Sequence, residues 1–350
     1  MVALRHPGGR IEYEVNVNEY CEHLRAAGAR VLAGSEDTLW ASTRSFVMQR
    51  RPYFALHVPS KEEIQAVFSG FHTALLSFTT SCSDLPPLLS SDPAPGPAWG
   101  VPSYLYICSD PEYSQQKLSQ SARSHIRRSL NEFQIRFVAP AELLKLGSKA
   151  YCDTRTRFGL SQSTRQAFEA TFCLAQSFRR YIGAFKDRQL AAFLAITEVD
   201  DWASIGPGYS VSELLALRPH NGLLFRALQH YLVEKKYRLV DHGLSNFPFT
   251  GKVESLHKFK VKMGFQAYPV YRRFVINPLL RPFVNRLSWR MATGLQKLSP
   301  HNPLFGQMEL ALRMALRTEP STCRVSADGR RARPPLEFHH LGDPSELDRG

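Results

Sequence analysis

Residues 181–210 read YIGAFKDRQLAAFLAITEVDDWASIGPGYS, and this stretch decides the fold. It holds three apolar runs, at 181–185, 190–198 and 202–210, separated by two short charged turns. Apolar runs of strand length that are bounded by polar turn residues are typical of neighbouring antiparallel strands. The stretch therefore predicts a meander of three strands, which places a sheet at the centre of the protein.

The residues that follow the meander predict a helix and two further strands. Apolar side chains recur at helical intervals over 223–236, and a short strand follows at 238–243. A basic segment at 252–262 then leads to a last strand at 268–276. The order is thus three strands, a helix, a strand, a basic segment and a strand.

The residues before the meander predict alternating helices and strands. Strands are expected at 104–107 and 134–138, and helices at 114–131 and 141–151. A further helix is expected from Ser163 or Thr164 to 180, since either residue can cap its N-terminus. The chain is therefore of the α/β class, with a mixed sheet flanked by helices.

Composition divides the chain into four parts. Residues 1–103 form an N-terminal region that ends in a proline-rich linker at 81–102, where proline is too dense for a helix or a central strand. Residues 104–277 form the main domain, and 278–317 form basic amphipathic C-terminal helices. The segment 318–350 is rich in Arg, Pro, Asp and Glu without periodicity, and we expect it to be disordered.

Charge and cysteine content limit the classes of function. Lys and Arg number 44 against 31 Asp and Glu, a net charge of +13 that favours anionic partners. The 6 cysteines form no CxxC pair, which excludes a disulfide scaffold and argues against a structural zinc site. The N-terminus has no apolar core of signal-peptide length, and the uncharged stretch 64–83 is too polar for a membrane span. We expect a cytoplasmic protein without a metal.

Three motifs in the predicted order resemble the GNAT acyltransferase superfamily, and most closely its Fem-type branch. Asp153 to Leu160 (DTRTRFGL) resembles the arginine-containing turn after the first helix of that branch. Val240-Asp241-His242-Gly243 resembles its strand end with an Asp and a Gly. Leu256 to Phe265 (LHKFKVKMGF) resembles its Phe-Lys-x-x-aromatic-Gly motif, with Met263 at the aromatic position. The likeness covers roughly residues 105–277.

The resemblance implies a GNAT-like mixed sheet with a reduced N-terminal half and added C-terminal helices. The implied reaction is transfer of an acyl group from acyl-CoA, acetyl-CoA first, to an amine of a sugar or cell-envelope precursor. Direct attack without a covalent enzyme intermediate would be the mechanism, because this chemistry mainly needs a polarised carbonyl and a neutral amine held together.

The family's phosphate-binding loop is altered in this chain. GNAT enzymes that use acetyl-CoA carry several glycines before a helix whose amides hold the pyrophosphate. Here the segment Arg218-Pro219-His220-Asn221-Gly222-Leu223-Leu224 has one glycine. The residues that the resemblance assigns to the cofactor are Gly208, Tyr209, Asn221, Gly222 and Leu223.

The same resemblance implies that the third strand of the meander separates from its neighbour and offers a backbone amide to the acyl carbonyl. Gly206-Pro207-Gly208 suits a bulge at that place, because proline removes a ladder donor. The alternative is an ordinary strand end.

The expected catalytic residues are Asp241, Lys260 and Tyr209. Asp241 would accept the amine proton, Lys260 would stabilise a developing oxyanion or hold a phosphate, and Tyr209 would protonate the leaving group. The alternatives are a carboxylate that caps a loop, a solvated lysine and a packed tyrosine. If Asp241 faces the cleft, strand alternation turns His242 to the opposite face.

Three basic residues complete the expected site. Arg155, Arg157 and Lys258 would bind anionic groups of the acceptor, although the arginines could equally cap a helix. Cys152 and Cys173 lie in predicted helices among apolar neighbours, which favours small buried side chains over nucleophiles.

Partners follow from the basic surface. The acceptor would be a small-molecule or lipid-linked sugar or peptide precursor, and the C-terminal helices could contact an anionic membrane at the inner face. No DNA is expected. Two alternatives remain: aminoacyl transfer from tRNA, of which Fem enzymes are capable, and a non-catalytic module that binds anionic polymer or membrane.

Overall fold

The computed structural model describes most of the chain between residues 2 and 299. The described residues are 2–6, 9–13, 17–26, 28–34, 38–42, 47–71, 73–81, 98–159, 164–172, 179–199, 201–245 and 253–299, with positions 305, 308, 309 and 312. The expected disordered segment 318–350 lies outside them, as does Cys173.

The N-terminal lobe contains six strands and two helices in the described residues. They are β1 (Val2–His6), β2 (Gly9–Tyr13), α1 (Val17–Ala26), β3 (Arg30–Ala33), β4 (Leu39–Ser42), β5 (Val47–Arg51), α2 (Lys61–Phe71) and β6 (Leu75–Ser81). Helix α2 begins after Ser60, whose hydroxyl accepts a hydrogen bond from the Glu63 amide at 3.1 Å. The apolar side of α2 packs with Trp40, Met48 and Val275.

The rest of the described chain forms the C-terminal lobe and a final helix. Its elements are β7 (Ala98–Cys108), α3 (Gln120–Glu132), β8 (Gln134–Val138), α4 (Pro140–Leu146), α5 (Ser148–Arg157), α6 (Arg165–Phe172), β9 (Arg179–Lys186), β10 (Gln189–Val199), β11 (Trp202–Ser210), the 3-10 helix η3 (Ser212–Leu217), α7 (Pro219–Leu228), β12 (Leu239–Leu244), α8 (Val253–Lys262), β13 (Gln266–Ile276), the 3-10 helix η5 (Pro278–Phe283) and α9 (Arg286–Leu298). A π-helical turn, Gln229–Glu234, continues α7.

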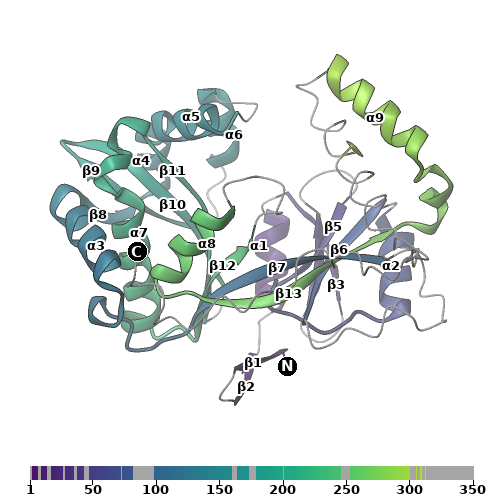
Figure 1. The fold of residues 1–350 in the computed structure, drawn as a ribbon, viewed down its shortest axis with the longest axis horizontal. Helices are drawn as coiled ribbons and strands as arrows, with labels where there is room; N and C mark the ends of the chain where they lie inside the picture. Colours follow the sequence, from purple (N-terminus) through teal and green to yellow (C-terminus); the bar gives the residue numbers. More distant parts are fainter. Residues whose placement is uncertain are drawn as a thin grey trace, which may run out of the picture.

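One mixed sheet runs through both lobes. In the described residues it has 11 strands in the order β3-β4-β5-β6-β13-β7-β12-β11-β10-β9-β8. The long strands β7 and β13 pair with each other and connect the lobes (Figure 1). The α/β fold class is confirmed, and the N-terminal region shares its sheet with the main domain because β6 pairs with β13.

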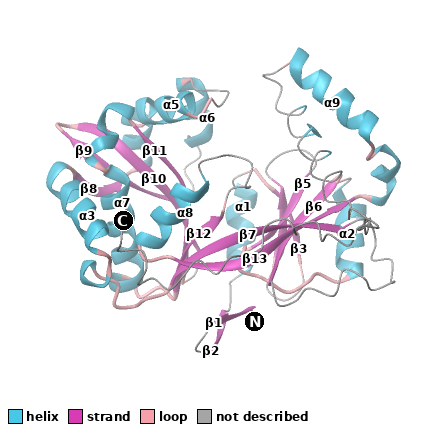
Figure 2. Cartoon of the chain, viewed as in Figure 1, coloured by secondary structure: helices cyan, strands magenta, loops and turns pink. Residues whose placement is uncertain are grey.

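Helices cover both faces of the sheet in the C-terminal lobe (Figure 2). On one face α3 and α7 pack their apolar side chains over β9 to β12, around Ile126, Leu224 and Ile196. On the other face α4, α5 and α6 enclose an aromatic cluster that includes Tyr151 and Phe168. The meander is therefore buried on both sides, which explains why its strands read as nearly continuous apolar runs.

Several predicted boundaries differ from the structure. Strand β7 begins at Ala98, inside the predicted linker, and contains Pro102; this is tolerated because β12 pairs only with the Leu105–Cys108 part of β7. Strand β9 begins at Arg179, where a helix was expected to continue. The motif that begins at Asp153 starts inside α5: Asp153 to Arg157 form the last turns of the helix, and Phe158 and Gly159 follow in a turn.

Candidate functional site

Strands β11 and β12 pair over three residues and then separate. The parallel pairs are Trp202 with Leu239, Ala203 with Val240 and Ser204 with Asp241. Beyond Ser204, strand β11 continues to Ser210 with β10 as its neighbour, while β12 continues beside β7. The predicted opening of the sheet is confirmed, and it leaves the backbone edge of β11 without a strand partner among the described residues.

A bulge shapes the edge of β11 at this opening. Ile205 pairs with Ile196 and Gly208 with Leu194, so that Gly206 and Pro207 together face a single residue of β10. Two residues opposite one define a β-bulge, which bends the strand and redirects its backbone groups. The predicted bulge is confirmed.

Gly208 brings a neighbouring side chain close to the backbone. A Cβ atom at this position would lie 2.8 Å from Cε1 of His220, so only glycine fits under the imidazole. The bulge therefore lies on the cavity side of β11, where the His220 imidazole packs against Gly208.

A cavity of about 650 Å³, here called the β11–β12 cavity, fills the opening. Its lining comes from seven elements (α5, β10, β11, η3, α7, β12 and α8) and the turns beside them. The residues are Arg157, Phe158, Leu194, Ile205, Gly206, Pro207, Gly208, Ser210, Leu215, Arg218, Pro219, His220, Asn221, Leu224, His242, Leu256, Phe259 and Lys260. This volume is sufficient for a small-molecule group of substrate size.

Lys260 is the buried cation of the cavity. Its side chain extends from α8, is 4% exposed, and donates a hydrogen bond from Nζ to the carbonyl of His242 at 2.7 Å. The ammonium also lies 4.1 Å from the centre of the Tyr106 ring. Burial lowers the pKa of Lys260 to about 8, an effect that the nearby Asp241 carboxylate opposes. The group is thus held in place and is positively charged at neutral pH.

Asp241 lies behind the cavity and does not line it. Its Oδ1 accepts hydrogen bonds from the Gly243 amide at 2.9 Å and from Ser204 Oγ at 3.2 Å. Burial raises the pKa of Asp241 to about 6, although these hydrogen bonds and the charges of Arg51 and Lys260 act in the opposite direction. The carboxylate therefore supports the strand end and the charge of Lys260, and its role as proton acceptor stays a prediction.

His242 occupies the face that was expected for Asp241. It lines the cavity, and burial together with the Lys260 charge lowers the pKa of His242 to about 3. A second histidine, His220, lines the cavity from the first turn of α7, and burial lowers its pKa to about 4. Both imidazoles are therefore neutral at pH 7.

Tyr209 points to the opposite face of β11. Because side chains alternate along a strand, Gly208 and Ser210 line the cavity whereas Tyr209 does not. Its ring stacks on Phe193 at 4.9 Å inside the aromatic cluster under α5 and α6. Burial raises the pKa of Tyr209, which weakens it further as an acid. The geometry gives no support to Tyr209 as the donor of a proton to the leaving group.

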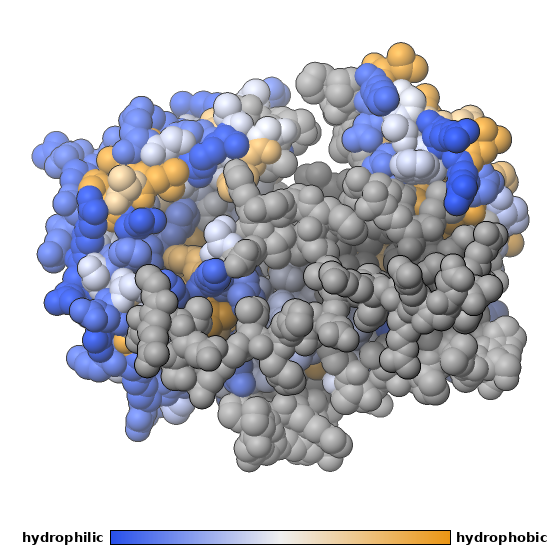
Figure 3. All heavy atoms as spheres, in the orientation of Figure 1, coloured by the Kyte–Doolittle hydropathy of each residue, from blue (hydrophilic) through white to orange (hydrophobic). Residues whose placement is uncertain are grey.

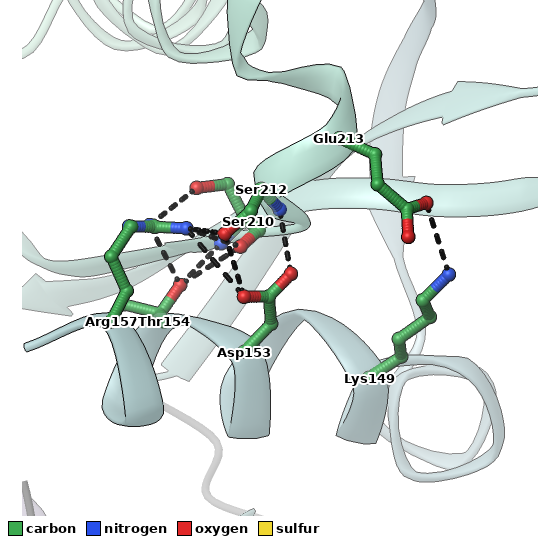
Figure 4. Close-up of polar contacts among 7 residues, drawn as sticks. All are labelled: Lys149, Asp153, Thr154, Arg157, Ser210, Ser212 and Glu213. Carbon is green, nitrogen blue, oxygen red and sulfur yellow. Dashed lines mark hydrogen bonds and ion pairs between the residues drawn. The ribbon is translucent and has the colours of Figure 1, made fainter.

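The predicted substrate-binding arginines have different positions. Arg157 lines the cavity, but its guanidinium donates to Ser212 Oγ at 2.7 Å and to Ser210 Oγ at 3.1 Å (Figure 4). Arg155 lies outside the lining, with its guanidinium 5.5 Å from the Tyr151 ring centre. Lys258 is exposed on α8 and also lies outside the lining.

The network around Arg157 fixes α5 to the end of β11. Thr154 Oγ1 accepts from the Ser210 amide at 2.8 Å and donates to the Ser210 carbonyl at 3.1 Å. Asp153 accepts from the amide and the hydroxyl of Ser212, both at 2.6 Å (Figure 4). The arginine-containing motif therefore fixes the position of the end of β11, which forms part of the cavity wall.

Three positions in the first turn of α7 offer no free amide to the pyrophosphate of CoA. Pro219 has no N–H, the Asn221 amide donates to the Arg218 carbonyl at 3.0 Å, and the Gly222 amide donates to Ser129 Oγ at 3.2 Å. Gly222 faces α3, where a Cβ would lie 2.4 Å from Ser129 Oγ, and Leu223 is fully buried. Of the residues expected to bind the cofactor, Gly208 and Asn221 line the cavity.

Sequence reasoning missed His220, Arg218 and Phe259 as cavity residues. The signal was present for His220 and Arg218, because both belong to the altered loop segment at the start of α7. Arg218 takes a left-handed conformation with φ of 63°, which turns the chain from η3 into the helix. No group of three or more metal-ligating side chains occurs in the part of the chain that the structure describes.

No protein-family model and no curated protein sequence matches this chain. Among solved structures, it is similar to the C-terminal domain (DUF2156) of a putative lysylphosphatidylglycerol synthetase from Agrobacterium fabrum, with 14% identity, a TM-score of 0.50, and coverage of 75% of this chain and 88% of that one. It is also similar to FemX, with 11% identity, a TM-score of 0.50, and coverage of 75% and 92%. A GCN5-related N-acetyltransferase from Kribbella flavida matches with 10% identity, a TM-score of 0.43, and coverage of 74% and 93%.

The likenesses to FemX and to the DUF2156 domain are likenesses of fold, since the sequence identities are 11% and 14%. The resemblance to GNAT and Fem-type proteins that the motifs indicated is confirmed at the level of the fold. The chain therefore shares its fold, at low sequence identity, with FemX and with the DUF2156 domain.

Proposed function

We propose that this protein is an acyltransferase that moves an acyl group from an activated ester or thioester carrier to an amine. One observation carries the proposal: the pairing of β11 and β12 ends at Ser204 and Asp241, and a cavity with a buried ammonium opens there. A carbonyl bound at this edge meets backbone donors on one side and the Lys260 charge on the other. Such preorganised groups stabilise the oxyanion of acyl transfer.

The reaction would proceed by direct attack. The neutral amine attacks the carbonyl carbon, and the resulting oxyanion is stabilised by the β11 backbone and Lys260. The new carbon–nitrogen bond then replaces the carbon–sulfur or carbon–oxygen bond to the carrier, and the proton lost by the amine passes through water to the departing thiolate or alkoxide, which leaves as the free thiol or alcohol. Asp241 contributes by keeping Lys260 charged, since its carboxylate raises the pKa of that lysine.

The acceptor in this proposal is an amine of a sugar or cell-envelope precursor. The support is electrostatic: the chain has a net charge of +13, and Arg157, Arg218 and Lys260 all line the cavity. Precursors of this kind carry phosphate groups, which arginine and lysine bind well.

The carrier could be acyl-CoA or another activated ester. The cavity of about 650 Å³ has room for the acyl end of a CoA thioester. However, the Gly222 and Asn221 amides in the first turn of α7 already donate hydrogen bonds to Ser129 and Arg218. This mismatch favours a second candidate, aminoacyl transfer from tRNA. The similarity to FemX and to a domain of a putative lysylphosphatidylglycerol synthetase, whose name contains an aminoacyl product, supports the same candidate.

The two carriers can be separated by binding and by transfer. Thermal unfolding with acetyl-CoA, longer acyl-CoAs and free CoA tests the first, and transfer of radiolabelled amino acid from charged tRNA to amino-sugar precursors tests the second. A rise in unfolding temperature with acyl-CoA that Leu224→Trp abolishes, by filling the cavity beside α7, assigns CoA to the β11–β12 cavity. If no member of either carrier class binds or reacts, the acyltransferase proposal is wrong.

Lys260→Met tests the proposed oxyanion contact with whichever carrier reacts. We expect kcat to fall roughly 100-fold or more, because a transition-state donor is lost, while KM changes little. Lys262→Met is the matched control, since Lys262 is exposed on the same helix and lies outside the cavity. A Lys260→Met protein with the turnover of the control would remove this lysine from the mechanism.

A further inference from the structure

Helix α9 and the η5 turn before it expose apolar side chains to an unusual degree. Leu298 is 84% exposed, Leu279 81%, Leu287 67%, Phe283 65% and Met291 62%. In the space-filling view, hydrophobic side chains stand along the outer part of the α9 region, beside hydrophilic ones (Figure 3). A contiguous apolar surface of this kind marks an interaction site in a folded protein.

Basic side chains flank this apolar face. Arg286, Arg290 and Lys297 fall within about 40° of one another around the helix, at roughly 100° of rotation per residue. Residues 278–298 contain no Asp or Glu, so that nothing within η5 and α9 neutralises these charges. The helix thus combines an apolar face and a cationic strip that lie side by side.

An apolar hollow lies between α9 and the sheet. It has a volume of about 560 Å³ and is lined by Leu75 and Ile276 at the strand ends and by Val284, Ala292 and Leu295 on the helix side. Helix α9 is anchored by the bond from Trp289 Nε1 to Glu309 Oε1 at 2.9 Å, and its apolar face does not close onto the sheet. Apolar surface therefore remains open both on the helix and beneath it.

We propose that η5 and α9 form a docking surface for an anionic lipid bilayer. The apolar side chains would enter the interface of the membrane, and Arg286, Arg290 and Lys297 would contact lipid phosphates. Helix α9 has 13 residues, fewer than the roughly 20 that a membrane-spanning helix needs, so it would lie in the plane of the surface. No helix in the described part of the chain is long and apolar enough to cross a bilayer.

Charge and composition favour a bilayer over other occupants. A second copy of this chain docked face to face would bring the three cations against their own equivalents, which is unfavourable. The segment 318–350 carries five Arg and six acidic residues but few large apolar side chains, and offers too little apolar surface to cover η5 and α9. Phosphatidylglycerol membranes present both a negative surface and an apolar interior.

Vesicle co-flotation of the full chain tests the proposal. The probes are vesicles of phosphatidylcholine alone and of equal parts phosphatidylcholine and phosphatidylglycerol. We expect binding to the mixed vesicles, weakened by salt, and little binding to phosphatidylcholine. Arg286→Gln with Arg290→Gln should weaken binding to the mixed vesicles roughly 30-fold, because each basic residue contributes about a fivefold gain at such a surface.

The apolar contribution is tested separately. Leu287→Gln with Met291→Gln leaves the net charge unchanged and should reduce binding at least tenfold. The matched control is Val58→Gln with Val233→Gln, two exposed apolar residues far from α9 in the sequence, which should bind as the unmodified protein does. All variants change exposed positions, and unfolding temperatures equal to that of the unmodified protein show that they fold.

Three results would overturn the proposal. They are absence of binding to mixed vesicles at low salt, equal loss of binding in the control variant, and dimerisation of the unmodified protein that Leu287→Gln with Met291→Gln abolishes. The measurement uses no acyl donor, so its outcome does not depend on the proposed reaction.

Discussion

Lys260 and Asp241 form the electrostatic centre of the site. Burial moves their pKa values toward each other, to about 8 for the lysine and about 6 for the aspartate. Both groups are therefore charged between about pH 6 and pH 8. An oxyanion is therefore stabilised best over a narrow pH range around neutrality, in which Lys260 and Asp241 are both charged.

Asp241→Asn should move the activity profile. Asn can still accept from the Gly243 amide and Ser204, but the carboxylate that raises the pKa of Lys260 is gone. We expect the alkaline limb of kcat to shift from about pH 8 to lower pH, measured as a pH–rate profile. An unmoved alkaline limb would show that this limb does not report Lys260.

The same substitution has a predictable effect on stability. The folded-state pKa of Asp241 is raised above 3.8, so the stability that its protonation contributes is fully present below about pH 4 and is lost as pH rises through about 6. The stability advantage of the unmodified protein over Asp241→Asn should therefore shrink between pH 4 and pH 6, in urea unfolding curves. A stability difference that stays constant between pH 4 and pH 6 would contradict the raised pKa of Asp241.

The sequence was sufficient to identify Lys260 and Asp241 as candidate site residues, but it did not predict which way their side chains point. The FKVKMGF motif identified Lys260, and strand alternation correctly separated Asp241 from His242. The alternation of side chains along a strand shows which residues share a face, but it does not show which face lines a cavity. That choice depends on the way β12 leaves β11, a tertiary property, and the same holds for Tyr209.

Among the contacts between elements, the buried Thr154 hydroxyl forms two of the hydrogen bonds that join α5 to β11. Thr154→Val keeps the shape of the side chain but removes the acceptor of the Ser210 amide and the donor to the Ser210 carbonyl. We expect a loss of about 1–3 kcal/mol in the free energy of unfolding, because Ser210 is fully buried. Thr156→Val on the exposed side of the same helix is the control and should change stability little. Equal effects of the two substitutions would show that the Thr154 bonds are replaceable.

Strand prediction succeeded where apolar runs were bounded by turns. The ranges of β8 and β11 agree with those expected, since their ends are marked by charged or helix-starting residues. The helix expected at 141–151 is two helices, α4 and α5, that meet at Gly147. There a Cβ would lie 2.9 Å from the Leu143 carbonyl and 2.9 Å from the Phe168 ring, and the second conflict appears only once α6 is packed against Gly147.

Because one sheet runs through both lobes, we expect the whole molecule to unfold cooperatively. Val270 of β13 pairs with Ser81 of β6 and with Ser103 of β7, so it belongs to both lobes. Val270→Ala should cost about 2 kcal/mol, because the side chain is fully buried. We expect circular dichroism and the fluorescence of the four tryptophans to show one coincident transition, shifted equally by the substitution. Two separate transitions would mean that the lobes unfold independently.

The pairing of β6 with β13 also determines when the protein can be completed during its synthesis. Thr79 of β6 pairs with Arg272 of β13. The sheet of the amino-terminal lobe therefore cannot be completed until the ribosome has made a strand that lies almost 200 residues later in the chain. Until then one edge of β6 is open to neighbouring nascent chains, and closing so long a loop is slow. We infer that co-translational folding cannot finish one lobe before the other, and that chaperones which shield strand edges matter more here than for a chain of sequential domains.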